Sequence, residues 1–217
     1  RNPLSKLLYA LCGLILIPGI VVTFSRGGFL GFVCAVLFLT WKLARRGRVI
    51  FIGFGLTLVI GLVALAPGAF RNRIATTRDA SAMARTDDLK RSVYLALRHP
   101  LFGIGMGNYV FYSNQAKATH NAYTQVAAEM GLAAAAFYLV FLIAPLKKLR
   151  SIELEHRDVP GRKPRAYYLS IALQTSLLGY MVTSFFSSVA YLWYAYYLVG
   201  YAICVRRIYQ QPGKNTS

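Results

Sequence analysis

The sequence predicts an all-α, polytopic membrane protein with about six transmembrane helices and a mainly helical loop on the outward side. Hydrophobic residues make up 56% of the chain and the mean hydropathy is +0.46, which is typical of a protein that lies largely in lipid. Several apolar segments approach the roughly 20 residues that a helix needs to cross the hydrocarbon layer. The alternative is a soluble helical protein whose apolar helices are buried in its core.

Three of these apolar segments come first in the chain. They span residues 7–24, 29–43 and 49–66, and the second is slightly shorter than a full crossing. Residues 1–66 are therefore predicted to form three transmembrane helices. The chain begins without an initiator methionine or a signal-peptide pattern, which indicates the C-terminal part of a longer membrane protein.

A second group of apolar segments follows the outward loop. Residues 132–146 form one predicted helix, whereas residues 167–205 are too long for a single crossing. The polar run at 183–188 is predicted to form a tight turn that divides this region into two helices. Residues 131–217 are thus predicted to hold three helices, with a basic cytoplasmic loop at about 147–166.

The basic residues set the orientation, because cytoplasmic loops carry an excess of Lys and Arg. These residues cluster in alternate connections of the chain, at Lys6, 45–48, 147–165 and 206–207. With those connections in the cytoplasm, residues 67–130 face the opposite side of the membrane and form the outward loop.

The outward loop is itself unusually basic, although short outward loops are normally poor in Lys and Arg. This excess predicts an anionic partner at the outward surface, and phosphate groups are the obvious candidates. Nucleic acid is not expected as a partner on that side of a membrane. The acidic residues of the loop are Asp79, Asp87 and Asp88. Its basic residues are Arg71, Arg73, Arg78, Arg85, Lys90, Arg91, Arg98 and Lys117.

Helical spacing and glycines divide the outward loop. An apolar stripe predicts a helix over 84–97, with Thr86 or Asp87 capping its start. Pro100 is predicted to end this helix. Alternating glycines then allow the backbone to turn sharply or to approach a ligand closely; they are Gly103, Gly105 and Gly107.

A polar run, Thr119-His120-Asn121, closes the outward loop. Asn121 is predicted to begin a helix, which places His120 where free N–H groups and the helix dipole favour an anion. Imidazole, with an ordinary pKa of about 6.5, suits a general base at neutral pH. The alternative is a histidine with a purely structural role.

An arginine lies between the first two predicted helices, in the run Ser25-Arg26-Gly27-Gly28. A guanidinium group at membrane depth is costly and commonly functional, and its planar fork suits a diphosphate. Alternatively, Arg26 ends a helix and extends toward lipid headgroups.

In their order along the chain, these features resemble the O-antigen ligase/polymerase superfamily, and within it the O-antigen ligases most closely. The resemblance covers about residues 20–145 and depends on the ordered set of motifs rather than on a single one. The motifs are Ser25-Arg26-Gly27-Gly28, Arg85 before an amphipathic helix, His99-Pro100-Leu101-Phe102-Gly103-Ile104-Gly105, Thr119-His120-Asn121 and Glu129-Met130-Gly131-Leu132.

The resemblance implies a glycosyltransferase of the bacterial inner membrane, with residues 67–130 as a periplasmic catalytic loop. The donor would be a glycan on undecaprenyl diphosphate and the acceptor lipid A-core, with neither cofactor nor metal. Arg26 and Arg85 would bind the diphosphate, and His120 would be the catalytic residue. Further candidates for substrate contact are Asn121, Lys117 and Arg98.

The chemistry of these residue types agrees with that implication. A departing diphosphate gains negative charge, which two arginines can stabilise electrostatically without a metal. A positioned base for the acceptor hydroxyl contributes about 10²–10⁴-fold in rate. No nucleophile lies beside a base in the sequence, so a single displacement with inversion at the anomeric carbon is predicted. Asp87-Asp88 are either a metal pair or, with basic neighbours, solvated ion pairs.

Three other functions stay open on the sequence. A polymerase that joins repeat units and a protein O-oligosaccharyltransferase would use the same donor with a different acceptor. A transporter of an anionic lipid would use Arg26 and Arg85 for binding alone, and would favour charged or broken helices near the bilayer midplane. Loss of transfer in His120→Ala with donor binding retained would distinguish an enzyme from a carrier.

Overall fold

The computed structural model describes residues 3–23, 25–43, 80–113, 118–157 and 164–209, with a few isolated positions between them. The described residues form helices and no strands, so the predicted all-α class is confirmed. The predicted span 49–66 lies almost wholly outside the described residues. The helices are α1 (Pro3–Val22), α2 (Arg26–Leu43), α5 (Ala80–Arg98), α6 (Tyr109–Tyr112), α7 (Ala122–Glu155), α8 (Arg165–Ser184) and α9 (Trp193–Tyr209).

Two of the described helices, α2 and α7, are long and apolar enough to cross a membrane. Helix α1 carries a shorter apolar stretch, Leu7–Ile20. Helices α8 and α9 occupy the region for which the sequence predicts two crossings, with residues 185–192 between them. The count of six transmembrane helices stays a prediction.

One helix extends beyond its predicted apolar span, and the predicted start of another is wrong. Helix α7 does not end at residue 146 but continues to Glu155, because Lys, Leu, Arg and Glu are good helix formers even where the sequence is no longer apolar. Helix α5 begins at Ala80, since the alanines at its start also favour a helix. Thr86 and Asp87 therefore lie inside α5 and do not cap it.

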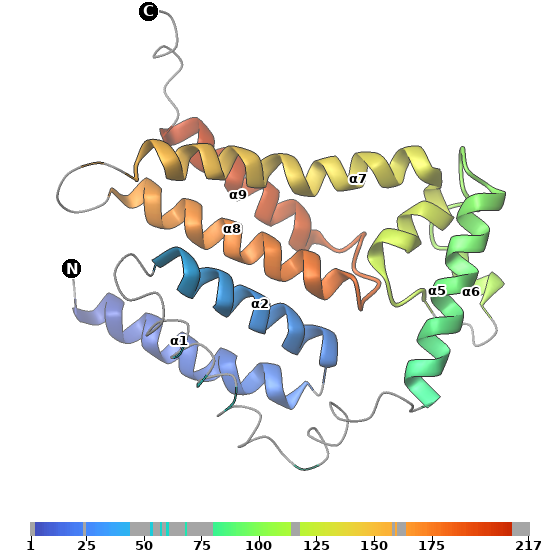
Figure 1. The fold of residues 1–217 in the computed structure, drawn as a ribbon, viewed down its shortest axis with the longest axis horizontal. Coiled ribbons are helices and arrows are strands. Elements are labelled where there is room, and N and C mark those ends of the chain that lie inside the picture. The colour runs from blue at the N-terminus through green and yellow to red at the C-terminus, as the bar shows by residue number, and fades with distance from the viewer. Residues whose placement is uncertain are drawn as a thin grey trace, which may run out of the picture.

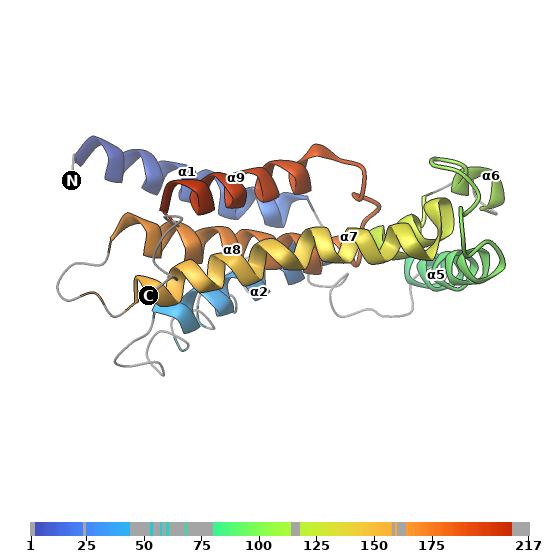
Figure 2. The ribbon, with the colours of Figure 1, turned by 90° about the horizontal axis from the view of Figure 1, so that it is seen from above.

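The helices α1, α2, α7, α8 and α9 form an elongated bundle, and α5 crosses one end of it (Figures 1 and 2). Helix α8 contacts α2, α7 and α9. Small residues permit the closest approach, since a Cβ atom at Gly31 would overlap the side chain of Thr183 on α8. Outward-facing apolar side chains such as Leu16 and Phe137 are exposed, as expected for helices in contact with lipid.

Helix α7 is broken at Gly131, where φ is 88° and ψ is 171°. A positive φ of this kind is readily adopted only by glycine. The break allows the N–H group of Leu132 to donate to the carbonyl of Pro100, at 2.8 Å, instead of to its own helix. A Cβ atom at residue 131 would overlap the backbone of Leu101, so both conformation and space require glycine.

The glycine-containing loop after α5 supplies the other hydrogen bonds that the break removes. In an unbroken helix the carbonyl of Ala128 would accept from residue 132. It accepts instead from the N–H of Ile104 at 3.0 Å, and the carbonyl of Glu129 accepts from Gly105 at 2.9 Å. Buried backbone groups must be paired, so this loop and the broken helix stabilise each other and connect α5 to α7.

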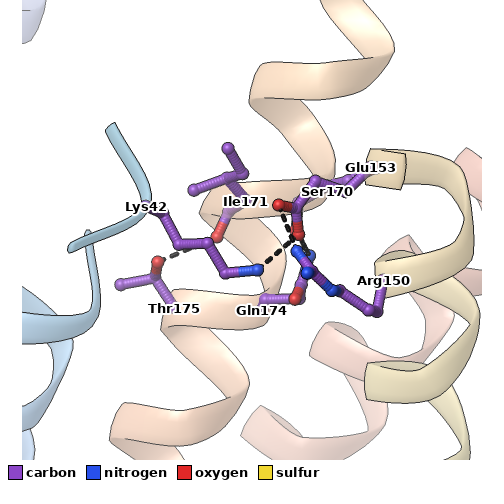
Figure 3. A network of polar contacts seen from close by, with 7 residues as sticks. All are labelled: Lys42, Arg150, Glu153, Ser170, Ile171, Gln174 and Thr175. Carbon is purple, nitrogen blue, oxygen red and sulfur yellow. Dashed lines mark hydrogen bonds and ion pairs between the residues drawn. The ribbon is translucent and has the colours of Figure 1, made fainter. Parts of the chain in front are cut away.

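A buried polar cluster joins α2, α7 and α8 near the C-terminal end of α2 (Figure 3). Glu153 is only 4% exposed and pairs with Lys42 at 2.6 Å and with Arg150 at 2.5 Å. The side-chain amide of Gln174 donates to the same carboxylate at 2.9 Å. Two cations and an amide thus compensate the buried negative charge.

Lys42→Met should lower the free energy of unfolding, because it leaves Glu153 buried with less compensation. Breaking a buried ion pair costs about 3–5 kcal/mol, and the retained Arg150 contact places the loss near the lower limit. Thermal unfolding of the purified protein in detergent measures the change. Arg150→Ala is the control, since that side chain is 40% exposed and should cost less. An Arg150→Ala loss equal to that of Lys42→Met would contradict the prediction.

Gly131→Ala should destabilise the protein by about 1–3 kcal/mol, because an alanine must adopt a strained positive φ and also meets the backbone of Leu101. Gly200→Ala on α9 is the matched control, since a Cβ atom there meets nothing within 4 Å. In a helix interior that change is expected to stabilise by roughly 0.5–1 kcal/mol. Thermal unfolding of both variants decides the point, and equal midpoints would show that the break at residue 131 needs no glycine.

Candidate functional site

The start of α2 holds Arg26 at one end of the bundle. The side-chain oxygen of Ser25 accepts from the N–H of Gly28 at 3.1 Å, which is the geometry of a helix N-cap. Gly27 has no side chain, and a Cβ atom there would overlap Phe186. The glycine therefore allows the segment between α8 and α9 to pack directly against the first turn of α2, beside Arg26.

Arg85 lies in the first half of α5, and a hydrogen bond from α6 fixes this helix in place. The hydroxyl of Tyr109 donates to the carbonyl of Asp88 at 2.9 Å. Burial, with a smaller contribution from Asp88, raises the pKa of Tyr109 to about 12, so this hydroxyl stays a donor at neutral pH. In this position Arg85, Thr86 and Leu89 line a pocket at the end of the bundle.

His120 lies in the turn that immediately precedes α7. The next residue, Asn121, caps the helix, because its side-chain oxygen accepts from the N–H groups of Tyr123 at 2.9 Å and Thr124 at 3.0 Å. His120 itself has a φ of 54°, which is uncommon for a residue other than glycine. Its N–H group donates to the hydroxyl of Ser188 at 2.8 Å.

Glu129 connects three segments around the site. It is 2% exposed, and its carboxylate accepts from the N–H of Tyr109 at 3.2 Å and from the hydroxyl of Tyr191 at 2.8 Å. Burial, followed by the contact with Glu129, raises the pKa of Tyr191, so the tyrosine remains a donor. Glu129 thereby links α7 with α6 and with the segment between α8 and α9.

Arg26, Arg85 and His120 line a single pocket with a volume of about 330 Å³. These three residues come from α2, from α5 and from the turn before α7, which are distant in the sequence. None of the described residues that line the pocket is acidic. The wall also includes the polar residues Thr86, Thr119 and Asn121 and the apolar residues Leu30, Leu89, Phe185 and Phe186.

The arrangement suits an anion beside a hydroxyl group. Guanidinium groups bind phosphate oxygens through several N–H donors, and an imidazole can accept a proton from a hydroxyl at neutral pH. The apolar wall provides a surface for the nonpolar part of a ligand. Among the described residues, no group of three or more His, Cys, Asp and Glu side chains is placed to hold a metal ion.

The secondary candidates from the sequence have different locations. Asn121 lines the pocket, but its side-chain oxygen is used as the cap of α7. Arg98 lies at the other end of α5 from Arg85, outside the pocket lining, and donates to the hydroxyl of Tyr94 at 2.7 Å. Lys117 lies outside the described residues.

Residues 185–192 contribute to the site in a way that the sequence does not predict. Phe185 and Phe186 form part of the pocket wall, and Ser188 binds the backbone of His120. The polar run at 183–188 was interpretable only as a turn between helices, because nothing local indicates which distant residue a serine hydroxyl contacts. The sequence places Glu129 in a motif but does not indicate that its carboxylate bonds to Tyr109 and Tyr191.

Asn121→Ala should reduce the free energy of unfolding by about 0.5–2 kcal/mol, which is the usual cost of losing an N-cap. Asn121→Ser should retain most of the stability, since serine caps nearly as well. Thermal unfolding of both variants in detergent provides the measurement. If the serine variant unfolds as early as the alanine variant, Asn121 does not act mainly as a cap.

A comparison with known protein families gives a match. The sequence model of the O-antigen ligase family matches residues 11–139, which is more than half of the chain and includes Arg26, Arg85 and His120. No curated protein and no solved structure matches the chain. The family and the apolar helices α2 and α7 indicate a membrane protein. The chain belongs to the O-antigen ligase family.

Proposed function

We propose that this protein is a glycosyltransferase that moves an O-antigen glycan from undecaprenyl diphosphate to lipid A-core, on the periplasmic face of the bacterial inner membrane. Family membership supports the general type of function. The observation that carries the proposal is that Arg26, Arg85 and His120 line the same pocket. The pocket thus contains two guanidinium groups that suit a diphosphate and one imidazole that suits proton transfer.

The proposed reaction is a single displacement. His120 accepts the proton of the acceptor hydroxyl as that oxygen attacks the anomeric carbon of the donor sugar. The bond between the anomeric carbon and the diphosphate oxygen breaks, and its electron pair remains on the departing diphosphate. Arg26 and Arg85 stabilise this charge electrostatically. Attack opposite the leaving group inverts the anomeric configuration, and no metal is required for any step.

The acceptor defines the function within this chemistry. A polymerase would present the hydroxyl of another repeat unit, and a protein O-oligosaccharyltransferase would present a serine or threonine. Both would use Arg26, Arg85 and His120 in the same roles. The resemblance of the motifs to O-antigen ligases favours lipid A-core. A transporter would need the arginines but not a base, so the requirement for His120 separates it from an enzyme.

His120→Ala should abolish transfer, because a positioned base contributes about 10²–10⁴-fold in rate. The full-length wild type and the variant would be expressed in a ligase-null Gram-negative strain, and the lipopolysaccharide would be examined by gel electrophoresis. The wild type should restore the glycan ladder. The variant should leave the glycan on its lipid carrier. A full ladder from a well-expressed His120→Ala variant would refute the proposed base.

Arg26→Ala and Arg85→Ala should each lower transfer by about 10²–10³-fold, by analogy with the loss of one group that stabilises transition-state charge. Arg98→Ala is the matched control, because this arginine lies on the same helix as Arg85 but outside the pocket lining. It should retain the ladder. Equal losses in Arg85→Ala and Arg98→Ala would show that general positive charge, rather than this pocket, matters.

A further inference from the structure

The conformation of His120 must be held by its surroundings. A φ of 54° places this residue in the left-handed region, which costs of order 1–3 kcal/mol for a residue other than glycine and persists only where neighbouring contacts determine it. This conformation sets the direction in which the side chain leaves the turn. The contacts that maintain it therefore control how the imidazole is presented to the pocket.

One such contact comes from Ser188, which lies between α8 and α9. Its hydroxyl accepts from the N–H of His120 at 2.8 Å and lies 3.1 Å from the hydroxyl of Thr119. The Thr119 hydroxyl donates its single proton to the carbonyl of Asn121 at 2.9 Å. A hydroxyl has one proton to donate, so Ser188 is the donor to Thr119.

The resulting network fixes both sides of His120. Thr119 is 1% exposed, and it also accepts from the N–H of Asn121 at 3.3 Å. Asn121 in turn caps α7. Ser188 is the member of this network that comes from a distant part of the chain, and it lies beyond the residues 11–139 that match the family. Removing its hydroxyl removes one accepted and one donated hydrogen bond.

We infer that Ser188 is a positioning residue for His120, which holds the histidine backbone in the conformation that directs its imidazole to the acceptor hydroxyl. The inference rests on the proposed function of His120 as the base. Ser188 does not line the pocket, so it acts through His120 and not on the substrate. Arg26 and Arg85 lie on α2 and α5, whereas Ser188 bonds to the backbone of His120 and to the side chain of Thr119. Loss of the Ser188 hydroxyl is therefore expected to change kcat rather than the donor KM.

The test compares Ser188→Ala with Ser188→Thr, which restores a hydroxyl, and with Ser187→Ala as the neighbouring control. Initial rates of transfer from an undecaprenyl-diphosphate-linked glycan to lipid A-core would be measured with purified full-length protein in detergent. Misplacement of a reacting group by about 1 Å can cost 10²-fold in rate, so kcat of Ser188→Ala should fall roughly 10- to 100-fold. The donor KM should stay unchanged, and the threonine and Ser187→Ala variants should resemble wild type.

A second arm separates positioning from general stability. In a His120→Ala background, Ser188→Ala should cause no further loss of residual transfer, because residues that act as a unit are not additive. If Ser188→Ala does not fold, Ser188→Cys is measured instead. Its side chain is similar in size to serine, but a thiol is only a weak hydrogen-bond donor and acceptor. Its kcat should lie well below that of Ser188→Thr, and equal values would overturn the inference.

The outcomes distinguish this inference from the proposed function. Full activity in His120→Ala would overturn the function itself. An inactive His120→Ala together with a wild-type kcat in Ser188→Ala would overturn only the positioning role. A rise in donor KM with unchanged kcat would also overturn it, because that pattern would place Ser188 in substrate binding rather than in presentation of the base.

Discussion

The break of α7 at Gly131 is the constraint on which the rest of the structure depends. The first part of α7 turns away from the bundle axis (Figure 1), and the loop after α5 pairs with the backbone groups that the break exposes. The same pairing fixes α5, which carries Arg85, relative to the turn that carries His120. A continuous helix would remove these hydrogen bonds between the loop and α7, which, together with the bond from Tyr109 to Asp88, hold α5.

A second set of contacts positions residues 185–192, which include the pocket residues Phe185 and Phe186. Because residue 27 is a glycine, Phe186 can pack against α2. Ser188 accepts a hydrogen bond from His120. Tyr191 donates to the buried carboxylate of Glu129. Residues 185–192 thus connect Arg26 with the turn before α7. The pocket lies where these contacts converge at one end of the bundle, and the buried Glu153 cluster joins the helices near the opposite end of α2.

The sequence was sufficient for the helical class, because apolar length and composition are local properties. It also made Arg26, Arg85 and His120 candidates, because each lies in a motif that resembles the family, and all three line one pocket in the structure. Their roles stay predictions. The apolar span predicted at 132–146 does not show where α7 ends, because helical propensity continues beyond the apolar residues, to Glu155. The sequence contains the motif Glu129-Met130-Gly131-Leu132, but it does not indicate that α7 breaks there. Only the fold reveals that Glu129 and Gly131 make contacts with loops far away in the sequence.

The central claim is that the pocket binds the donor diphosphate between two arginines and beside His120. The most direct measurement is a cryo-electron microscopy structure of the full-length His120→Ala variant bound to an undecaprenyl-diphosphate-linked glycan. The variant lacks the proposed base, so the donor should remain intact. We expect the diphosphate to contact Arg26 and Arg85, and the anomeric carbon to face residue 120. A diphosphate bound elsewhere, for example beside Arg98, would contradict it.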